Sequence, residues 1–137
     1  MMVPVSKTLL DTDVLSALMR STPAVVNRAR KYLGDHRRLT ISLVTRFEIF
    51  GLKAKRATAQ LAAFDSFCTN NEVLPIADHI IVRAADIYAD LHVRGQLIPD
   101  ADILIAATAL ENGLVIATNN VDDFGRIAGL RIDNWLT

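Results

Sequence analysis

The chain has 137 residues, of which 51% are hydrophobic, and its 15 basic and 15 acidic residues give a formal net charge of zero. This length predicts a single domain over residues 1–137 with a substantial core. A neutral chain has no global basic field, so a nucleic-acid partner must be held by a local patch. The single cysteine, Cys68, excludes an internal disulfide and a cysteine-rich zinc site. Because no apolar run approaches the roughly 20 residues that span a bilayer and the N-terminus lacks a signal-peptide pattern, we expect a cytoplasmic protein without membrane contact.

Short apolar runs alternate with amphipathic stretches along the chain, which is the pattern of strands alternating with helices. Strands are predicted at residues 8–10, 39–42, 73–76, 114–118 and 130–132. Helices are predicted at residues 14–19, 23–33, 44–55, 58–68, 77–93 and 100–111, with stops at Gly34 and Gly95. This order predicts an α/β fold, a three-layer sandwich with a mainly parallel central sheet flanked by helices.

Asp11 directly follows the first predicted strand. In an open parallel sheet, groups just past the carboxyl ends of strands face the ligand crevice, which favours a functional role for Asp11. The helix that comes next is expected to be capped by Thr12 or Asp13. Capping is also the alternative role for Asp11 itself.

Glu48 lies on the apolar stripe of its predicted helix, because Val44 and Leu52 occupy the positions four residues before and after it. A solvated glutamate more often has Lys or Arg at those spacings. We therefore expect Glu48 to point into the same site. The alternative is a core glutamate that is satisfied by one buried arginine, such as Arg46 or Arg83.

Asp102 lies in the first turn of the helix that follows Pro99. Acids in a first turn commonly interact with the helix dipole alone. Asp100 fits that role better, as the expected N-cap. Asp102 adjoins the most apolar helix of the chain and is the third candidate site residue.

A polar segment, residues 118–124, follows the most apolar strand and is expected to share the crevice with Asp11. In it, Thr118 is expected to orient a carboxylate, Asn120 to hold a metal-bound water and Asp123 to supply a fourth acid. Asn-Asn and Asp-Asp are also ordinary turn residues, and for Asp122 that role is an equal alternative.

Three carboxylates in apolar settings imply a divalent cation, because burying an unpaired carboxylate costs several kcal/mol. Clustered carboxylates repel until a cation neutralises them, and oxygen ligands suit Mg²⁺ or Mn²⁺ rather than zinc. A metal lowers the pKa of a water and so provides a nucleophile. No close zinc motif is formed by the histidines, which are expected to be structural or solvent-facing: His36, His79 and His92.

Four segments in this order resemble the PIN domain family. They are Leu-Leu-Asp-Thr-Asp-Val-Leu at 9–15, Thr-Arg-Phe-Glu-Ile at 45–49, Asp-Ile-Leu-Ile-Ala-Ala-Thr-Ala at 102–109, and Ala-Thr-Asn-Asn ending in Asp-Phe at 117–124. The length and the closing Gly-Leu-Arg-Ile-Asp-Asn-Trp at 129–135 are similar to the VapC branch, the toxin ribonucleases of type II toxin-antitoxin pairs. The resemblance spans nearly the whole chain.

The resemblance implies a metal-dependent endoribonuclease whose metal ligands fall on Asp11, Glu48 and Asp102. It also implies Mg²⁺ as cofactor, with Mn²⁺ as a substitute, and hydrolysis that leaves a 5′-phosphate. Many members have a fourth acid two residues after the strand-ending threonine, where this chain has Asn120. Either Asp123 takes over this role, or a site of three acids and an amide suffices.

The resemblance further implies a cognate VapB-like antitoxin whose tail occupies the active site, a toxin homodimer, and a higher-order complex with the antitoxin. A structured RNA is the expected substrate, such as a loop of tRNA or ribosomal RNA, because sequence-specific RNA recognition targets unstacked bases. For each of the candidate cations that could hold this RNA, a solvated surface group is the alternative: Arg37, Arg38, Lys53, Lys55, Arg56, Arg83 and Arg94.

Two other functions stay open. The strand-ending Asp11-Thr12-Asp13 also resembles the nucleophile loop of haloacid-dehalogenase-type phosphatases, although Leu15 stands where that family prefers Thr or Val and Glu48 has no role there. A non-catalytic interaction domain is the other alternative. Like charges without a metal would cost it stability.

Overall fold

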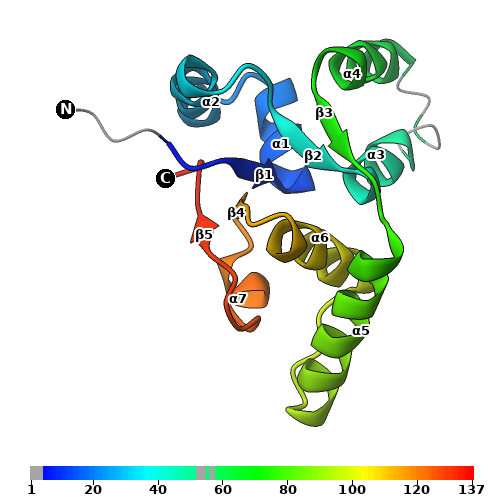
Figure 1. The fold of residues 1–137 in the computed structure, drawn as a ribbon. Coiled ribbons are helices and arrows are strands. Elements are labelled where there is room, and N and C mark those ends of the chain that lie inside the picture. Colours follow the sequence, from blue (N-terminus) through cyan, green and yellow to red (C-terminus); the bar gives the residue numbers. More distant parts are fainter. Residues whose placement is uncertain (1–4, 52–54, 56–57) are drawn as a thin grey trace.

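Five parallel strands form the central sheet of the computed structural model, which describes residues 5–51, 55 and 58–137 (Figure 1). In sheet order they are β3 (Glu72–Leu74), β2 (Thr40–Ser42), β1 (Thr8–Leu10), β4 (Val115–Ala117) and β5 (Ile132–Asp133). Each neighbouring pair is parallel, so the carboxyl ends of the strands lie along one edge of the sheet.

The central strand, β1, is buried along its whole length. A strand that is covered on both faces requires a continuous apolar run, and Leu9 and Leu10 provide it. Because successive side chains point to opposite faces, Leu9 enters one core and Leu10 the other. The ladder continues past the strand end, where the Asp11 N–H donates to the Ala117 carbonyl at 2.9 Å. This bond holds the polar segments after β1 and β4 side by side.

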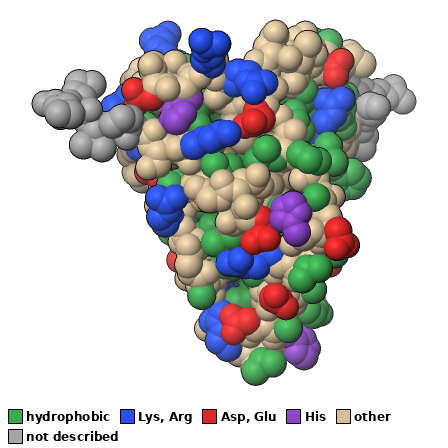
Figure 2. All heavy atoms as spheres, viewed as in Figure 1, with side chains coloured by type: hydrophobic (Ala, Val, Ile, Leu, Met, Phe, Trp, Pro, Cys, Tyr) green, Lys and Arg blue, Asp and Glu red, His purple; other side chains and the backbone are tan. Residues whose placement is uncertain are grey.

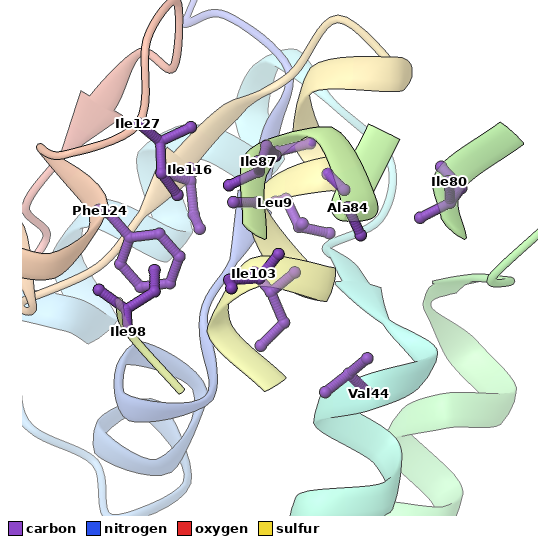
Figure 3. Close-up of a cluster of buried hydrophobic side chains, with 14 of the residues drawn as sticks. Leu9, Val44, Ile80, Ala84, Ile87, Ile98, Ile103, Ile116, Phe124 and Ile127 are labelled. Atoms are coloured by element: carbon purple, nitrogen blue, oxygen red, sulfur yellow. The ribbon is translucent and has the colours of Figure 1, made fainter. Parts of the chain in front are cut away.

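Helices cover both faces of the sheet. They are α1 (Thr12–Met19), α2 (Pro23–Asp35), α3 (Leu43–Phe50), α4 (Thr58–Asn70), α5 (Asp78–Val93), α6 (Asp100–Glu111) and α7 (Val121–Phe124). On one face, α5 and α6 pack against each other and enclose a core around Leu9, Ile103 and Ile116 (Figure 3). On the other face, α1, α2 and α4 surround Leu10 and Ile41. The predicted three-layer α/β sandwich is confirmed.

Several helix ends differ from the sequence-based expectation. α2 continues through Gly34, so this glycine is not a stop, and His36 is the C-cap. α3 ends at Phe50, and residues 52–54 of the longer helix that was expected lie outside the described residues. Pro99 rather than Asp100 is the N-cap of α6.

A short helix, α7, replaces the turn expected after β4. It begins after Asn120, whose side chain makes no capping bond to the helix backbone. Phe124 at its end is fully buried against the core of α5 and α6 (Figure 3). That anchor fixes the position of the preceding acids, Asp122 and Asp123.

In the described part of the chain, no helix combines the length and the apolar character needed to cross a membrane. On the face seen in Figure 2, acidic and basic side chains are interspersed. This mixture agrees with the zero net charge of the chain.

Candidate active site

Asp11 lies where β1 ends and α1 begins. Its Oδ1 accepts a hydrogen bond from the Thr12 N–H at 2.8 Å, so Asp11 is the N-cap of α1. The expectation that Thr12 or Asp13 caps this helix is wrong, because both lie within its first turn. Asp11 Oδ2 accepts a second bond from Thr118 Oγ1 at 2.8 Å. The residue is only 5% exposed, and both of its oxygens are held.

Glu48 reaches the same region from α3. Its Oε1 accepts a hydrogen bond from Thr12 Oγ1 at 2.7 Å. Thr12 Oγ1 also lies 2.9 Å from Thr45 Oγ1, on the turn of α3 that precedes Glu48. The first residue of α1 therefore contacts Asp11 through its backbone and Glu48 through its side chain.

Neither arginine that was considered as a partner of Glu48 contacts it. Arg46 Nη2 lies 3.5 Å from Asp65 Oδ1, and Arg83 Nη1 lies 2.9 Å from Glu111 Oε2. None of the ion pairs formed between described residues involves Glu48. The alternative interpretation of Glu48 as a core glutamate that is satisfied by Arg46 or Arg83 is therefore wrong.

Asp102 enters the site from the first turn of α6 and is partly buried. Burial raises the pKa of its carboxyl to about 6, and the negative charges of Glu48, Asp123 and Asp13 add to the rise. Like charges act this way at short range, because each disfavours the ionised form of the other. Acids from four different elements thus act on one another here.

Asp11 shows the same effect more strongly. Burial raises its pKa to about 7, the charge of Asp13 adds to the rise, and Asp102 contributes a smaller part. The hydrogen bonds from Thr118 and Thr12 oppose the rise, because they stabilise the ionised carboxylate. Burial and the neighbouring acids therefore disfavour the ionised form of Asp11.

The segment after β4 forms a chain of polar contacts. Thr118 Oγ1 donates to Asp11 and accepts a bond from the Asn120 N–H at 2.9 Å. Asn120 Nδ2 donates to Asp123 Oδ2 at 3.0 Å, and Asp123 Oδ1 lies 3.7 Å from Arg126 Nη2. Asp11 is thus connected to Asp123 through Thr118 and Asn120.

Asp13 also lies in this cluster, although the sequence left its role open between cap and site. Its Oδ2 accepts a bond from the Asn119 N–H at 3.0 Å. Its Oδ1 is buried and has no hydrogen-bond partner among the described residues. The available signal was its position two residues after a strand-ending acid, which places it in the first helical turn beside the crevice.

The donor set fits a hard divalent cation. Every candidate ligand is a carboxylate oxygen, and Mg²⁺ and Mn²⁺ prefer such ligands. The unpartnered oxygen of Asp13 and the raised pKa values of Asp11 and Asp102 show that positive charge would be accommodated. Among the described residues, no three His, Cys, Asp or Glu side chains already stand as a ligand set. A cation held by these acids would need their side chains to come closer together.

The histidines lie outside this cluster. His36 stacks on Tyr32 with ring centroids 4.3 Å apart, and its Nε2 is 2.7 Å from the Val5 carbonyl. His79 and His92 are exposed on α5. They are structural or solvent-facing, as the sequence predicts.

The cations expected to hold RNA are spread over the molecule. Arg37 and Arg38 precede β2, at the sheet edge opposite to the acids. Arg83 forms an ion pair with Glu111, and Arg94 forms one with Asp90. Lys53 and Arg56 lie outside the described residues, and Lys55 lines an apolar pocket next to α1 and α4.

Comparison with known protein families identifies the family to which the chain belongs. Residues 8–130 match the model of the PIN domain. This match covers most of the chain, from β1 to the segment before β5, and includes every candidate acid. The chain belongs to the PIN domain family.

Proteins named VapC are among its relatives. The tRNA(fMet)-specific endonuclease VapC of Shigella flexneri is 30% identical over 131 residues, which are 94% of this chain and 98% of that protein. The protein of the same name from Salmonella typhimurium is 33% identical over 131 residues, which are again 94% of this chain and 98% of that protein.

Solved structures of VapBC complexes share the fold. DNA-bound VapBC from Salmonella typhimurium has a TM-score of 0.83 at 30% identity and covers 96% of this chain and 99% of its own. VapBC-1 from nontypeable Haemophilus influenzae has a TM-score of 0.81 at 26% identity, with 95% and 98% covered. The likeness therefore extends over nearly the whole of both chains.

Proposed function

We propose that this chain is a VapC-type endoribonuclease, the toxin of a toxin-antitoxin pair, which hydrolyses phosphodiester bonds of RNA. The observation that carries the proposal is the convergence of Asp11, Glu48 and Asp102 from β1, α3 and α6 at the carboxyl edge of the sheet. Membership of the PIN domain family and relatives named as ribonucleases support it.

In this proposal, Asp11, Glu48 and Asp102 hold a Mg²⁺ ion, for which Mn²⁺ can substitute. When bound, such an ion supplies a water of lowered pKa and positive charge next to the scissile phosphate. Asp123 is the fourth catalytic acid. Hydrolysis then leaves a 5′-phosphate on the downstream RNA fragment.

Thr118 and Asn120 have supporting roles in this proposal. Thr118 holds Asp11 through its hydroxyl, and Asn120 holds Asp123 through its amide. Asn120 stands at the position where many PIN domains have their fourth acid. An amide cannot supply the charge of an acid, but this one fixes the carboxylate of Asp123 three residues later. The four acids and these two polar residues then form one connected site.

We propose a structured RNA as the substrate, such as a tRNA or ribosomal RNA loop. Two relatives at 30% and 33% identity carry the name of a tRNA(fMet)-specific endonuclease, so initiator tRNA is the first substrate to try. Unstacked loop bases are the usual targets of sequence-specific RNA recognition. The cytoplasm, where such RNA is found, is the proposed location.

We further propose a VapB-like antitoxin as partner. Solved structures that share the fold of this chain are VapBC complexes, some of them bound to DNA. An apolar cavity of about 660 Å³ lies beside α1 and α4, and two cations, Arg20 and Lys55, are among its lining residues. This surface suits an apolar segment that carries an acidic residue.

A homodimer, which joins the antitoxin in a higher-order complex, completes the proposed assembly. Two exposed apolar side chains support self-association: Phe47 on α3 is 78% exposed and Val82 on α5 is 56% exposed. Large apolar side chains left in water favour association.

The two alternatives account for less of the site. A haloacid-dehalogenase-like phosphatase that uses Asp11 gives no role to Glu48, which is held here by Thr12, and the family match does not favour it. A non-catalytic interaction domain leaves the repulsion among these acids without a function. The experiment that follows separates both from the nuclease.

The test is cleavage of initiator tRNA and bulk tRNA by the purified chain with Mg²⁺, followed by analysis of the RNA ends. We expect cleavage that stops with a chelator and leaves 5′-phosphates. Asp11→Asn and Asp102→Asn should each lower the rate at least about 100-fold while the fold is kept, since even residues around metal ligands are worth 10- to 100-fold.

The matched control is Asp122→Asn. Asp122 is an exposed acid on α7, one residue from Asp123, and its side chain forms no hydrogen bond or ion pair among the described residues. Its variant should cleave like wild type. Equal cleavage by wild type and Asp11→Asn would refute the nuclease site, and release of phosphate from small phosphomonoesters would favour the phosphatase.

A further inference from the structure

Among the described residues, only Thr12 donates hydrogen bonds to two of the candidate acids. Its backbone N–H donates to Asp11 Oδ1 at 2.8 Å, and its Oγ1 is 2.7 Å from Glu48 Oε1. Its backbone is fixed as the first residue of α1, directly after the cap. The hydroxyl of Thr12 is therefore presented to Glu48 from a rigid helix start.

Proton counting gives the direction of these bonds. A threonine hydroxyl has one hydrogen, and an ionised carboxylate can only accept. Thr12 therefore donates to Glu48, and the 2.9 Å contact between Thr12 Oγ1 and Thr45 Oγ1 is a bond that Thr45 donates. Thr45 is fully buried. The result is a one-way chain of hydrogen bonds from Thr45 through Thr12 to Glu48.

We propose that Thr12, with Thr45 behind it, is the positioning residue that sets the carboxylate of Glu48 for its role in the site. This inference rests on the proposed function, because it assigns Glu48 to that metal-binding set. Glu48 is a long side chain with several rotamers, and among the described residues no cation pairs with it. The Thr12 hydroxyl restricts this freedom before any cation arrives.

The choice of variants follows from the direction of these hydrogen bonds, from Thr45 through Thr12 to Glu48. Thr12→Val keeps the shape and removes the donor to Glu48. Thr12→Ser keeps the donor and serves as the rescue. Thr45→Val leaves the donor on Thr12 and removes only the bond behind it. In Thr12→Val, the freed hydroxyl of Thr45 can turn to a backbone carbonyl in the preceding turn, so no buried donor is stranded.

The experiment is a thermal-shift titration of each full-length variant with Mn²⁺, read together with the RNA cleavage rate at saturating metal. We expect Thr12→Val to need roughly 10-fold more Mn²⁺ for half of its thermal shift and to cleave 10- to 100-fold more slowly. Thr12→Ser should titrate like wild type. Thr45→Val should also need more Mn²⁺ and cleave more slowly than wild type, but by smaller factors than Thr12→Val.

A double-mutant cycle with Glu48→Ala shows whether Thr12 acts through Glu48. If it does, Thr12→Val adds nothing to the loss already caused by Glu48→Ala. Losses that multiply, or a Thr12→Val titration equal to that of wild type, overturn the inference. If wild type itself shows no metal response, the proposed metal site fails and the inference fails with it. A wild-type response shared fully by Thr12→Val refutes this inference alone.

Discussion

At the scale of single residues, the most informative property of the site is the pair of raised pKa values. Burial brings the pKa of Asp11 to about 7 and that of Asp102 to about 6, from an ordinary value of 3.8. In the folded state these two groups therefore bind more protons than in the unfolded state between about pH 4 and about pH 7. Their contribution to the free energy of unfolding falls as the pH rises through this window.

This sign gives a pH prediction. The melting temperature of chelator-treated wild type should decrease from about pH 5 to about pH 8, as Asp102 and then Asp11 lose their protons. Asp102→Asn removes one of the two groups, so its melting temperature should decrease less over the same range. All other residues are common to both proteins, so the comparison isolates the effect of Asp102. Parallel curves for the two proteins would show that Asp102 is not destabilised by its neighbours.

At the scale of elements, the sheet and the long helices could be predicted because each has a strong local signal. The apolar run of β1 and the amphipathic pattern of α5 are visible in the local sequence, so each element could be predicted without knowledge of its neighbours. The exact first residues of the helices were harder to predict. Thr12 and Asp13 are good capping residues, yet the chain turns one residue earlier, because Asp11 accepts from Thr12 and is bonded to β4.

α7 could not be predicted, because its formation depends on tertiary contacts rather than on its own sequence. Four residues are too few for a stable isolated helix. Buried Phe124 and the bond between Asn120 and Asp123 hold it in place. The candidate acids Asp11, Glu48 and Asp102 could be named from the sequence. The hydroxyl contacts among Thr12, Thr45 and Glu48 join residues far apart in the chain and required the fold.

The end of α7 gives a prediction with opposite signs at two glycines. A Cβ on Gly125 would lie 2.6 Å from the Val121 carbonyl oxygen, a backbone atom that cannot move aside easily. Gly125→Ala should therefore lower the free energy of unfolding by about 1–3 kcal/mol. Gly34 lies in α2 with nothing within 4 Å of such a Cβ, so Gly34→Ala should raise it by about 0.5–1 kcal/mol. Urea unfolding measures both. A change of the same sign in the two variants would contradict the account of α7.

At the scale of the whole molecule, the site is built from elements that are distant in sequence. Asp11 directly follows the central strand, while Glu48 and Asp102 belong to helices α3 and α6. α6 packs in the core around Leu9, and α3 contributes residues to both cores, so the three acids lie near the carboxyl edge of the sheet. Folding therefore brings negative charges together, and we expect a cation bound at the proposed site to stabilise the fold.

The most direct test of a common metal site is thermal unfolding of wild type and Asp102→Asn, each with chelator and with excess Mn²⁺ at fixed ionic strength. A ligand that binds only the folded state stabilises it by about 2.7 kcal/mol at one hundred times its Kd. Wild type should therefore melt higher with metal. Asp102→Asn has lost one repulsive charge, so without metal it should melt at or above wild type, and its rise with metal should be smaller. If the two proteins respond equally to metal, Asp102 is not a ligand, and the acids at the carboxyl edge do not form one metal site.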